Sequence, residues 1–143
     1  MKYIILSILL GTLFIGCKKA SIDHASVASS IVGTWELRHL VGGLQSPGNN
    51  PDYPLGNGNI LNFSDSSYYY YYPNRQLRGN GSYSLVKDTC AATGQYMDGI
   101  IFDRQSYSER CFEIKNNILT LYRGIVAADR TIETYERIYY YPL

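Results

Sequence analysis

The sequence has few of the residues on which enzyme chemistry and metal binding most often depend. It contains two histidines, three cysteines and one tryptophan in 143 residues. The common serine-hydrolase, zinc-protease and phosphate-loop motifs do not occur in it. His24 and His39 are isolated, and neither stands at metal-ligand spacing from a cysteine. We therefore expect a protein that is not an enzyme and that has no catalytic residue, no metal and no cofactor.

The chain also lacks an excess of charge of one sign. Thirteen lysines and arginines stand against twelve aspartates and glutamates, which gives a formal net charge of +1. Binding to phosphate backbones needs clustered positive charge, and no polybasic arm is present. We expect no nucleic-acid partner.

A hydrophobic run long enough to cross a membrane is missing as well. Residues 3–15 are almost wholly apolar, but this run of about a dozen residues is shorter than the ~20 that a membrane-spanning helix needs. It follows Lys2 and ends at Gly16 and Cys17, just before Lys18 and Lys19. That order is typical of a signal peptide rather than of a membrane span.

The same residues resemble the cleavage box of a bacterial lipoprotein precursor. The resemblance implies a signal peptide over residues 1–16 and lipidation of Cys17 by diacylglycerol and a further acyl chain such as palmitate. It also implies a cell-envelope location at the outer membrane, with the membrane contacted through the lipid anchor. An ordinary secretory signal with an incidental cysteine is the alternative interpretation.

The rest of the chain divides into a short linker and one domain. Residues 17–30 are small and polar and are expected to be a flexible linker. Residues 31–143 are enough for one domain with a single core. Cys90 and Cys111 lie in this domain, and an oxidising compartment would favour a disulfide between them over two free thiols.

Short alternating runs separated by glycine, asparagine, aspartate, proline and serine predict β-strands throughout the domain. A long connection is expected at residues 42–58 and another at 88–99. Consecutive strands joined mainly by short turns favour an up-and-down meander, and closure into a barrel removes its two edges. The fold class is therefore all-β, an eight-stranded antiparallel up-and-down β-barrel. Its expected strands are residues 33–41, 59–63, 68–72, 79–87, 99–104, 109–115, 118–125 and 131–139.

Two short motifs at the ends of this strand map resemble the lipocalin superfamily, and more closely the lipocalin-like domains of bacterial lipoproteins. Gly33 and Trp35 form a Gly-x-Trp at the start of the first strand, and Arg137 lies near the end of the last. The resemblance implies that Arg137 lies across the indole of Trp35 and closes one end of the barrel. The middle motif of that family is missing, which leaves another small β-barrel or a flattened sandwich open.

Tyrosine is abundant, with fifteen residues against four phenylalanines, and five tyrosines are consecutive at residues 68–72. In a strand these alternate between two faces, so one set would line the interior and the other would form an exposed stripe. The sequence does not decide which set is which. The candidate ligand-lining residues are Tyr68, Tyr70, Tyr72, Tyr83, Leu85, Phe102, Phe112 and Leu121.

Two functions are compatible with these patterns. The first is binding of a small hydrophobic or amphipathic molecule in the barrel. The second is an envelope interaction module whose exposed tyrosines bind a protein or a glycan.

Overall fold

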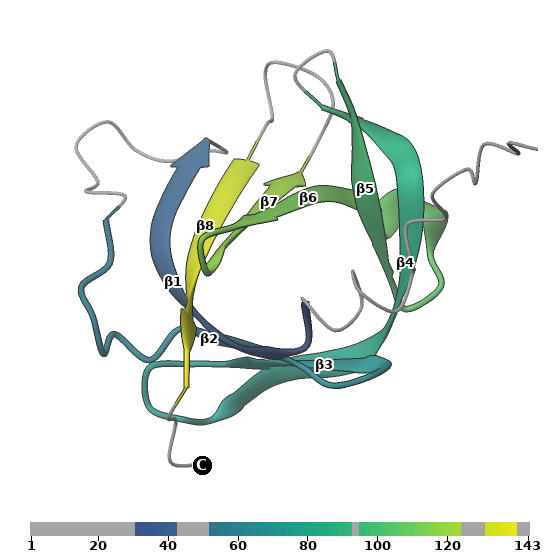
Figure 1. Cartoon of the computed structure of the whole chain (residues 1–143). Helices are drawn as coiled ribbons and strands as arrows, with labels where there is room; N and C mark the ends of the chain where they lie inside the picture. The colour runs from purple at the N-terminus through teal and green to yellow at the C-terminus, as the bar shows by residue number, and fades with distance from the viewer. Residues whose placement is uncertain (1–30, 43–51, 93–94, 124–130, 140–143) are drawn as a thin grey trace, which may run out of the picture.

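A computed structural model describes residues 31–42, 52–92, 95–123 and 131–139 of the chain. Within these ranges, eight antiparallel strands close into a barrel in the order of the sequence (Figure 1). The predicted all-β, up-and-down barrel is confirmed. The strands are β1 (Gly33–Gly42), β2 (Ile60–Phe63), β3 (Ser67–Tyr71), β4 (Leu77–Ala92), β5 (Gln95–Phe102), β6 (Arg110–Lys115), β7 (Ile118–Arg123) and β8 (Thr131–Ile138), with a short 3-10 helix, η1 (Ser106–Ser108), between β5 and β6.

The barrel closes where its first and last strands pair. β1 and β8 run antiparallel, and Trp35 lies opposite Arg137 in their register. The Arg137 guanidinium lies 4.1 Å from the centre of the Trp35 ring system and donates a hydrogen bond to the Val32 carbonyl at 2.8 Å. The indole is fully buried and donates from Nε1 to the Ile31 carbonyl at 2.8 Å. A guanidinium on an indole face contributes ~0.5–2 kcal/mol.

The glycine of the Gly-x-Trp motif makes room for this arrangement. Gly33 has a φ of +141°, a conformation that side chains disfavour, and a Cβ at this position would lie 2.7 Å from Arg137 Nη1. The small residue at the start of β1 is therefore required by the arginine at the end of β8.

Alternation along the strands places one apolar set inside the barrel. Trp35 and Leu37 of β1 and Leu61 and Phe63 of β2 are buried in the core, and Tyr135 of β8 joins them. Phe63 packs edge-on against Tyr83 at 5.0 Å between ring centroids. The other members of the core cluster are Ile31, Tyr68, Ile100, Phe102, Phe112, Leu119 and Leu121.

The prediction of a long connection at residues 88–99 is wrong, because residues 88–92 and 95–99 belong to strands. β4 continues to Ala92 and β5 begins at Gln95, so the two strands form one long hairpin. A register shift between Val86 and Cys90 interrupts the ladder. At that point Asp88 has a φ of +48°, and its backbone N–H donates to the carboxylate of Asp98 at 3.2 Å. This bulge interrupts the alternation of inward and outward side chains that marks a strand in a sequence.

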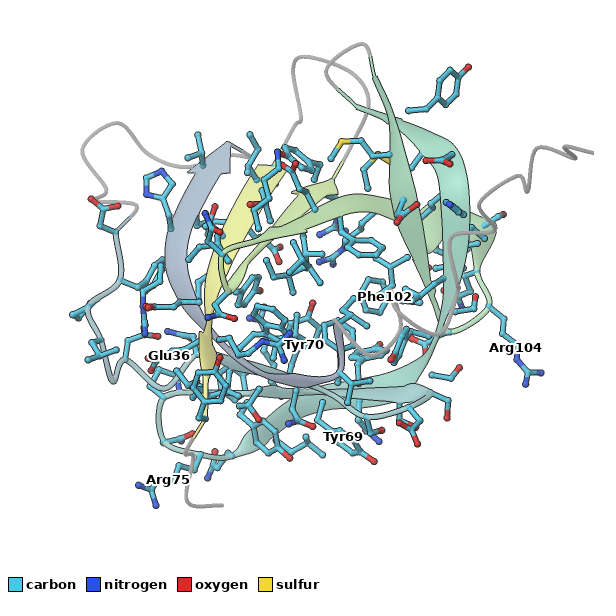
Figure 2. The ribbon with its side chains drawn as sticks, in the orientation of Figure 1. Glu36, Tyr69, Tyr70, Arg75, Phe102 and Arg104 are labelled. Carbon is cyan, nitrogen blue, oxygen red and sulfur yellow. A yellow bond between two sulfur atoms is a disulfide. The ribbon has the colours of Figure 1, made fainter. Side chains whose placement is uncertain are left out.

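Part of the predicted connection at residues 42–58 is also described, and it packs on the outside of β1. Glu36 points out of the barrel but is only 3% exposed, and its carboxylate accepts backbone N–H groups from Gly56 at 3.0 Å and Gly58 at 2.9 Å. His39 and Asp52 form an isolated bridge nearby. Figure 2 shows Glu36 on the side of β1 that faces this segment. A carboxylate thus attaches the segment to the barrel wall.

Candidate functional site

The structure shows which tyrosines of β3 face the interior of the barrel. Tyr68 belongs to the core cluster, and Tyr70 packs against it. Tyr69 alternates to the outer face. Tyr71, at the end of β3 where the register with β4 shifts, instead lines the smaller cavity described below. Tyr72 lies beyond the end of β3 and is 45% exposed. Figure 2 shows Tyr70 and Phe102 pointing into the barrel, with Tyr69 on its outside.

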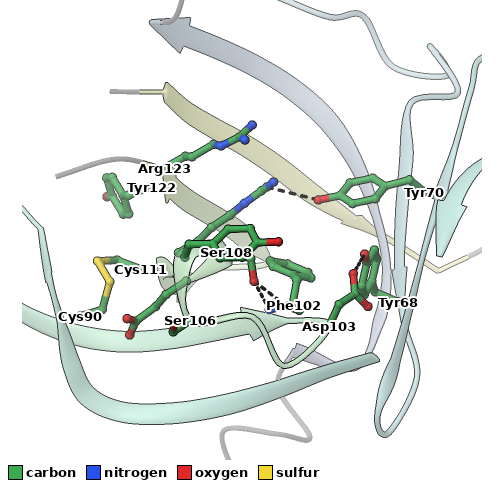
Figure 3. A pocket seen from close by; sticks show the side chains of 13 residues that line it. Tyr68, Tyr70, Cys90, Phe102, Asp103, Ser106, Ser108, Cys111, Tyr122 and Arg123 are labelled. Atoms are coloured by element: carbon green, nitrogen blue, oxygen red, sulfur yellow. Dashed lines mark hydrogen bonds between the residues drawn. A yellow bond between two sulfur atoms is a disulfide. The ribbon is translucent and has the colours of Figure 1, made fainter. Parts of the chain in front are cut away.

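A cavity of about 670 Å³ lies against these inward rings (Figure 3). Its walls come from β3 and β4, from the ends of β5, β6 and β7, and from the connection that contains η1. Tyr68 and Phe102 pack edge-on at 4.8 Å between ring centroids, which makes one wall aromatic. The residues that line the cavity are Tyr68, Tyr70, Cys90, Phe102, Asp103, Ser106, Tyr107, Ser108, Glu109, Arg110, Cys111, Tyr122 and Arg123.

A polar cluster centred on Arg110 adjoins the aromatic wall. Arg110 Nη1 donates to the Tyr70 hydroxyl and to Glu133 Oε2, each at 3.3 Å. The Tyr135 hydroxyl donates to the same Glu133 oxygen at 2.9 Å. The Arg110 guanidinium also lies 5.1 Å from the centroid of the Phe102 ring. Side chains from three other strands, β3, β5 and β8, therefore surround the guanidinium that β6 supplies.

Burial fixes the charge states of this cluster. It raises the pKa of Tyr70 and Tyr135, so both phenols stay protonated at neutral pH and act as donors or acceptors without charge. Burial disfavours the charged form of Arg110, but its interactions with Tyr70 and Glu133 outweigh this and raise its pKa. Burial and the neighbouring Asp103 carboxylate raise the pKa of Tyr68 to about 12. The cluster thus holds one guanidinium, one carboxylate and neutral phenols.

A second, smaller cavity of about 190 Å³ adjoins the first. Tyr70, Arg110 and Arg123 line both, so these three side chains lie between the two spaces. Arg78 and Glu133 also line the smaller cavity. The polar cluster therefore stands at the junction of an aromatic space and a more charged one.

The residues proposed from the sequence as ligand-lining fall into three groups. Tyr68, Tyr70 and Phe102 line the larger cavity. Tyr72 does not, because β3 ends before it and its side chain faces solvent beneath Arg78, whose guanidinium is 5.6 Å from the ring. The third group is packed into the core without lining either cavity, and it consists of Tyr83, Leu85, Phe112 and Leu121.

The disulfide between Cys90 and Cys111 is present in the structure and forms part of the cavity wall. It joins the far half of β4 to β6, with 5.3 Å between the two Cα atoms. Both cysteines are buried. Cys17, the expected lipidation site, lies outside the described residues.

Sequence reasoning missed the charged members of the site. Arg110 and Glu133 are two residues away from the buried Phe112 and Tyr135 on their own strands, so alternation places all four on inner faces. Arg123 stands in the same relation to Leu121. The available signal was a charged residue at an inward position of a strand, which no catalytic motif marks.

Comparisons with known proteins identify no relative. No family model matches the chain, and no curated protein matches it either. Among the described residues, no group of three or more His, Cys, Asp or Glu side chains is placed to hold a metal ion. In the same part of the chain, no helix combines the length and the apolar character needed to cross a membrane.

Proposed function

We propose that this protein binds a small apolar or amphipathic molecule inside its barrel, as a carrier or receptor rather than as an enzyme. The observation that carries the proposal is the cavity of about 670 Å³ with an aromatic wall and a converging polar cluster. Sites for drug-sized ligands are concave, occupy ~300–1,000 Å³ and combine apolar walls with a few placed polar groups. This cavity has both properties.

Binding would draw its free energy from removal of apolar ligand surface from water. Tyr68 and Phe102 offer ring faces that are already held edge-on to each other, so little side-chain ordering remains to oppose binding. Ser108 supports this wall because its hydroxyl accepts the Phe102 backbone N–H at 3.0 Å. The wall is thus preorganised before any ligand arrives.

The proposal includes a location for the protein. The order of residues 3–19 supports lipidation of Cys17 after removal of residues 1–16, and hence attachment to the outer membrane of the cell envelope. A barrel held there by lipid would meet molecules that dissolve poorly in water.

A second candidate function uses the outer face of β3. Tyr69 points away from the core, and Tyr72 is exposed just beyond the end of β3. An aromatic surface of this kind suits a protein or glycan partner in the envelope. Tyr69 and Tyr72 line neither cavity. Their replacement by serine would abolish such an interaction and leave binding in the barrel unchanged, which separates the two functions.

The cavity is tested with N-phenyl-1-naphthylamine, an uncharged fluorophore that brightens in apolar surroundings. We expect saturable binding to the purified protein with one site per chain. Ser106→Trp would place an indole at the cavity lining and should weaken binding by about tenfold or more. The matched control is Ser84→Trp, at an exposed position on β4. Absence of saturable binding, or equal binding by both variants, would overturn the proposal.

A further inference from the structure

The junction between the two cavities carries an excess of positive charge. Of the described residues that line the smaller cavity, three are arginines, Arg78, Arg110 and Arg123, and one is a glutamate, Glu133. No ion pair joins Arg78 or Arg123 to another residue in the described ranges. The single carboxylate therefore balances one of three guanidinium groups.

Arg110 also has unused hydrogen-bonding capacity. A guanidinium carries five N–H donors, and the hydrogen bonds of Arg110 within the described structure all leave from Nη1. Nε and Nη2 make none there. The side chain is 17% exposed, so these donors are accessible from the cavity. Because the Phe102 ring lies 5.1 Å from the guanidinium, the orientation of this fork is held in place.

Glu133, in contrast, is already engaged. It accepts from Arg110 and from the Tyr135 hydroxyl, and it is 17% exposed like its partner. A cationic ligand would have to displace these donors and would also meet Arg123 at the junction. The arrangement disfavours a cation at this junction. Two further carboxylates, Asp103 and Glu109, line the larger cavity, and Asp103 accepts hydrogen bonds from the Tyr68 hydroxyl and the Ser82 backbone N–H.

The apolar half of the site lies next to the cationic half. Phe102 contacts Arg110 on one side and Tyr68 on the other, so a ligand that reaches the guanidinium extends along aromatic surface. Figure 3 shows Phe102 and Tyr68 close to each other, and the hydrogen bond from Arg110 to the Tyr70 hydroxyl is drawn there as a dashed line.

We infer that the barrel selects an amphipathic organic anion, whose charged group is bound by Arg110 and Arg123 and whose apolar body lies against Phe102 and Tyr68. This inference rests on the proposed binding function and adds the ligand class. Carboxylate and sulfonate groups fit it, since their oxygens match the planar fork of a guanidinium. The Tyr70 hydroxyl, which Arg110 already contacts, is placed to orient the same group.

The experiment compares two fluorophores that share one aromatic skeleton. 8-Anilinonaphthalene-1-sulfonate carries a sulfonate that N-phenyl-1-naphthylamine lacks. Both are titrated into the purified protein, and the ratio of their dissociation constants is the readout. Because hydrogen bonds to charged groups are strong, we expect the dissociation constant of the sulfonate to be lower than that of the neutral fluorophore by about tenfold or more.

Three variants assign that preference to the arginines. Arg123→Gln, at an exposed position, should reduce the preference severalfold, because it weakens sulfonate binding more than binding of the neutral fluorophore. Glu133→Gln removes the competing carboxylate and should tighten sulfonate binding alone, a result that a merely structural ion pair would not produce. Arg110→Gln should abolish the preference, with cooperative thermal unfolding as the check that it folds. Lys115→Gln, on an exposed lysine of β6, is the charge-matched control.

The outcomes separate the two proposals. If the neutral fluorophore binds and the sulfonate shows no preference, the anion inference is overturned while the binding function stands. If neither binds, both fail. A preference that persists in Arg123→Gln and does not rise in Glu133→Gln would also overturn the inference.

Discussion

Glu36 provides the sharpest test of how the outer segment is held on the barrel. Its carboxylate accepts the Gly56 and Gly58 backbone N–H groups and a hydrogen bond from Arg38 Nη1 at 2.6 Å. Both Glu36 and Gly58 are buried. Arg38 in turn donates from Nε to Glu136 of β8 at 2.8 Å, so the cluster joins β1, β8 and residues 56–58.

The replacement Glu36→Gln keeps the shape and removes the charge. One amide oxygen can replace one carboxylate oxygen, but the amide nitrogen would then face an N–H donor. At least one buried donor loses its partner, which costs about 1–3 kcal/mol, and the ion pair with Arg38 is lost as well. Arg38 Nη2 is already without a hydrogen-bond partner in the described structure, so Arg38 has little capacity to compensate. We expect a loss of about 3 kcal/mol.

The pH dependence gives a second, independent readout. Burial alone would raise the pKa of Glu36, but the hydrogen bonds from Gly58, Arg38 and Gly56 outweigh it and lower the pKa below 4.5. A lowered folded-state pKa contributes stability above the unfolded-state value, and this stability is lost as the pH falls through the folded-state value. The wild-type protein should therefore lose stability on acidification below about pH 4.5, and Glu36→Gln should lose less.

The assay is urea unfolding at neutral pH and at pH 3.5, followed by tyrosine and tryptophan fluorescence. Glu113→Gln is the control, since it makes the same chemical change at a solvent-exposed ion pair with Lys115, for which we expect a much smaller loss of stability. Equal free energies of unfolding for the two variants at neutral pH would refute the reasoning. So would an unchanged acid-induced loss in Glu36→Gln.

Three further predictions concern the closed end, the disulfide and the anchor. Gly33→Ala should destabilise the barrel by about 1–3 kcal/mol in thermal unfolding, because of its φ and its contact with Arg137; an unchanged midpoint would contradict this. Replacing Cys90 and Cys111 together by alanine should lower the free energy of unfolding, measured in urea, by about 3 kcal/mol. If loss of the disulfide is the cause, the wild-type protein in reducing conditions should have the same free energy of unfolding as this variant. Cys17→Ser should abolish incorporation of labelled palmitate in cells, and retained label would exclude Cys17 as the lipidation site.

Much of the barrel could be predicted because its strands are defined by local signals. The turn between β6 and β7 is an example, since Asn116 and Asn117 both adopt positive φ as a two-residue hairpin turn requires. The pairing of Trp35 with Arg137 followed from placing the first strand beside the last. Alternation and turn residues are properties of neighbouring positions, and a sequence displays them directly.

The carboxylate of Glu36 could not be predicted in the same way. Its partners at Gly56 and Gly58 are backbone groups about twenty residues away, and nothing in the side chains of those glycines marks them as donors. The bulge at Asp88 is similar, because one residue with a positive φ carries a strand across what resembles a loop. Both features depend on where backbone N–H groups point after the chain has folded.

The inward-facing charged residues of the site could be predicted only in part. Arg110 and Glu133 occupy positions that alternation marks as interior, and a charge there is unfavourable unless it is paired. They pair with each other across two strands that are not adjacent in the barrel, β6 and β8, with β7 between them. An apolar pair of similar size would fill the same space at no electrostatic cost, so packing alone does not account for a guanidinium with open donors beside an aromatic wall. The anion recognition that we infer would account for it, and the sulfonate preference would measure that contribution directly.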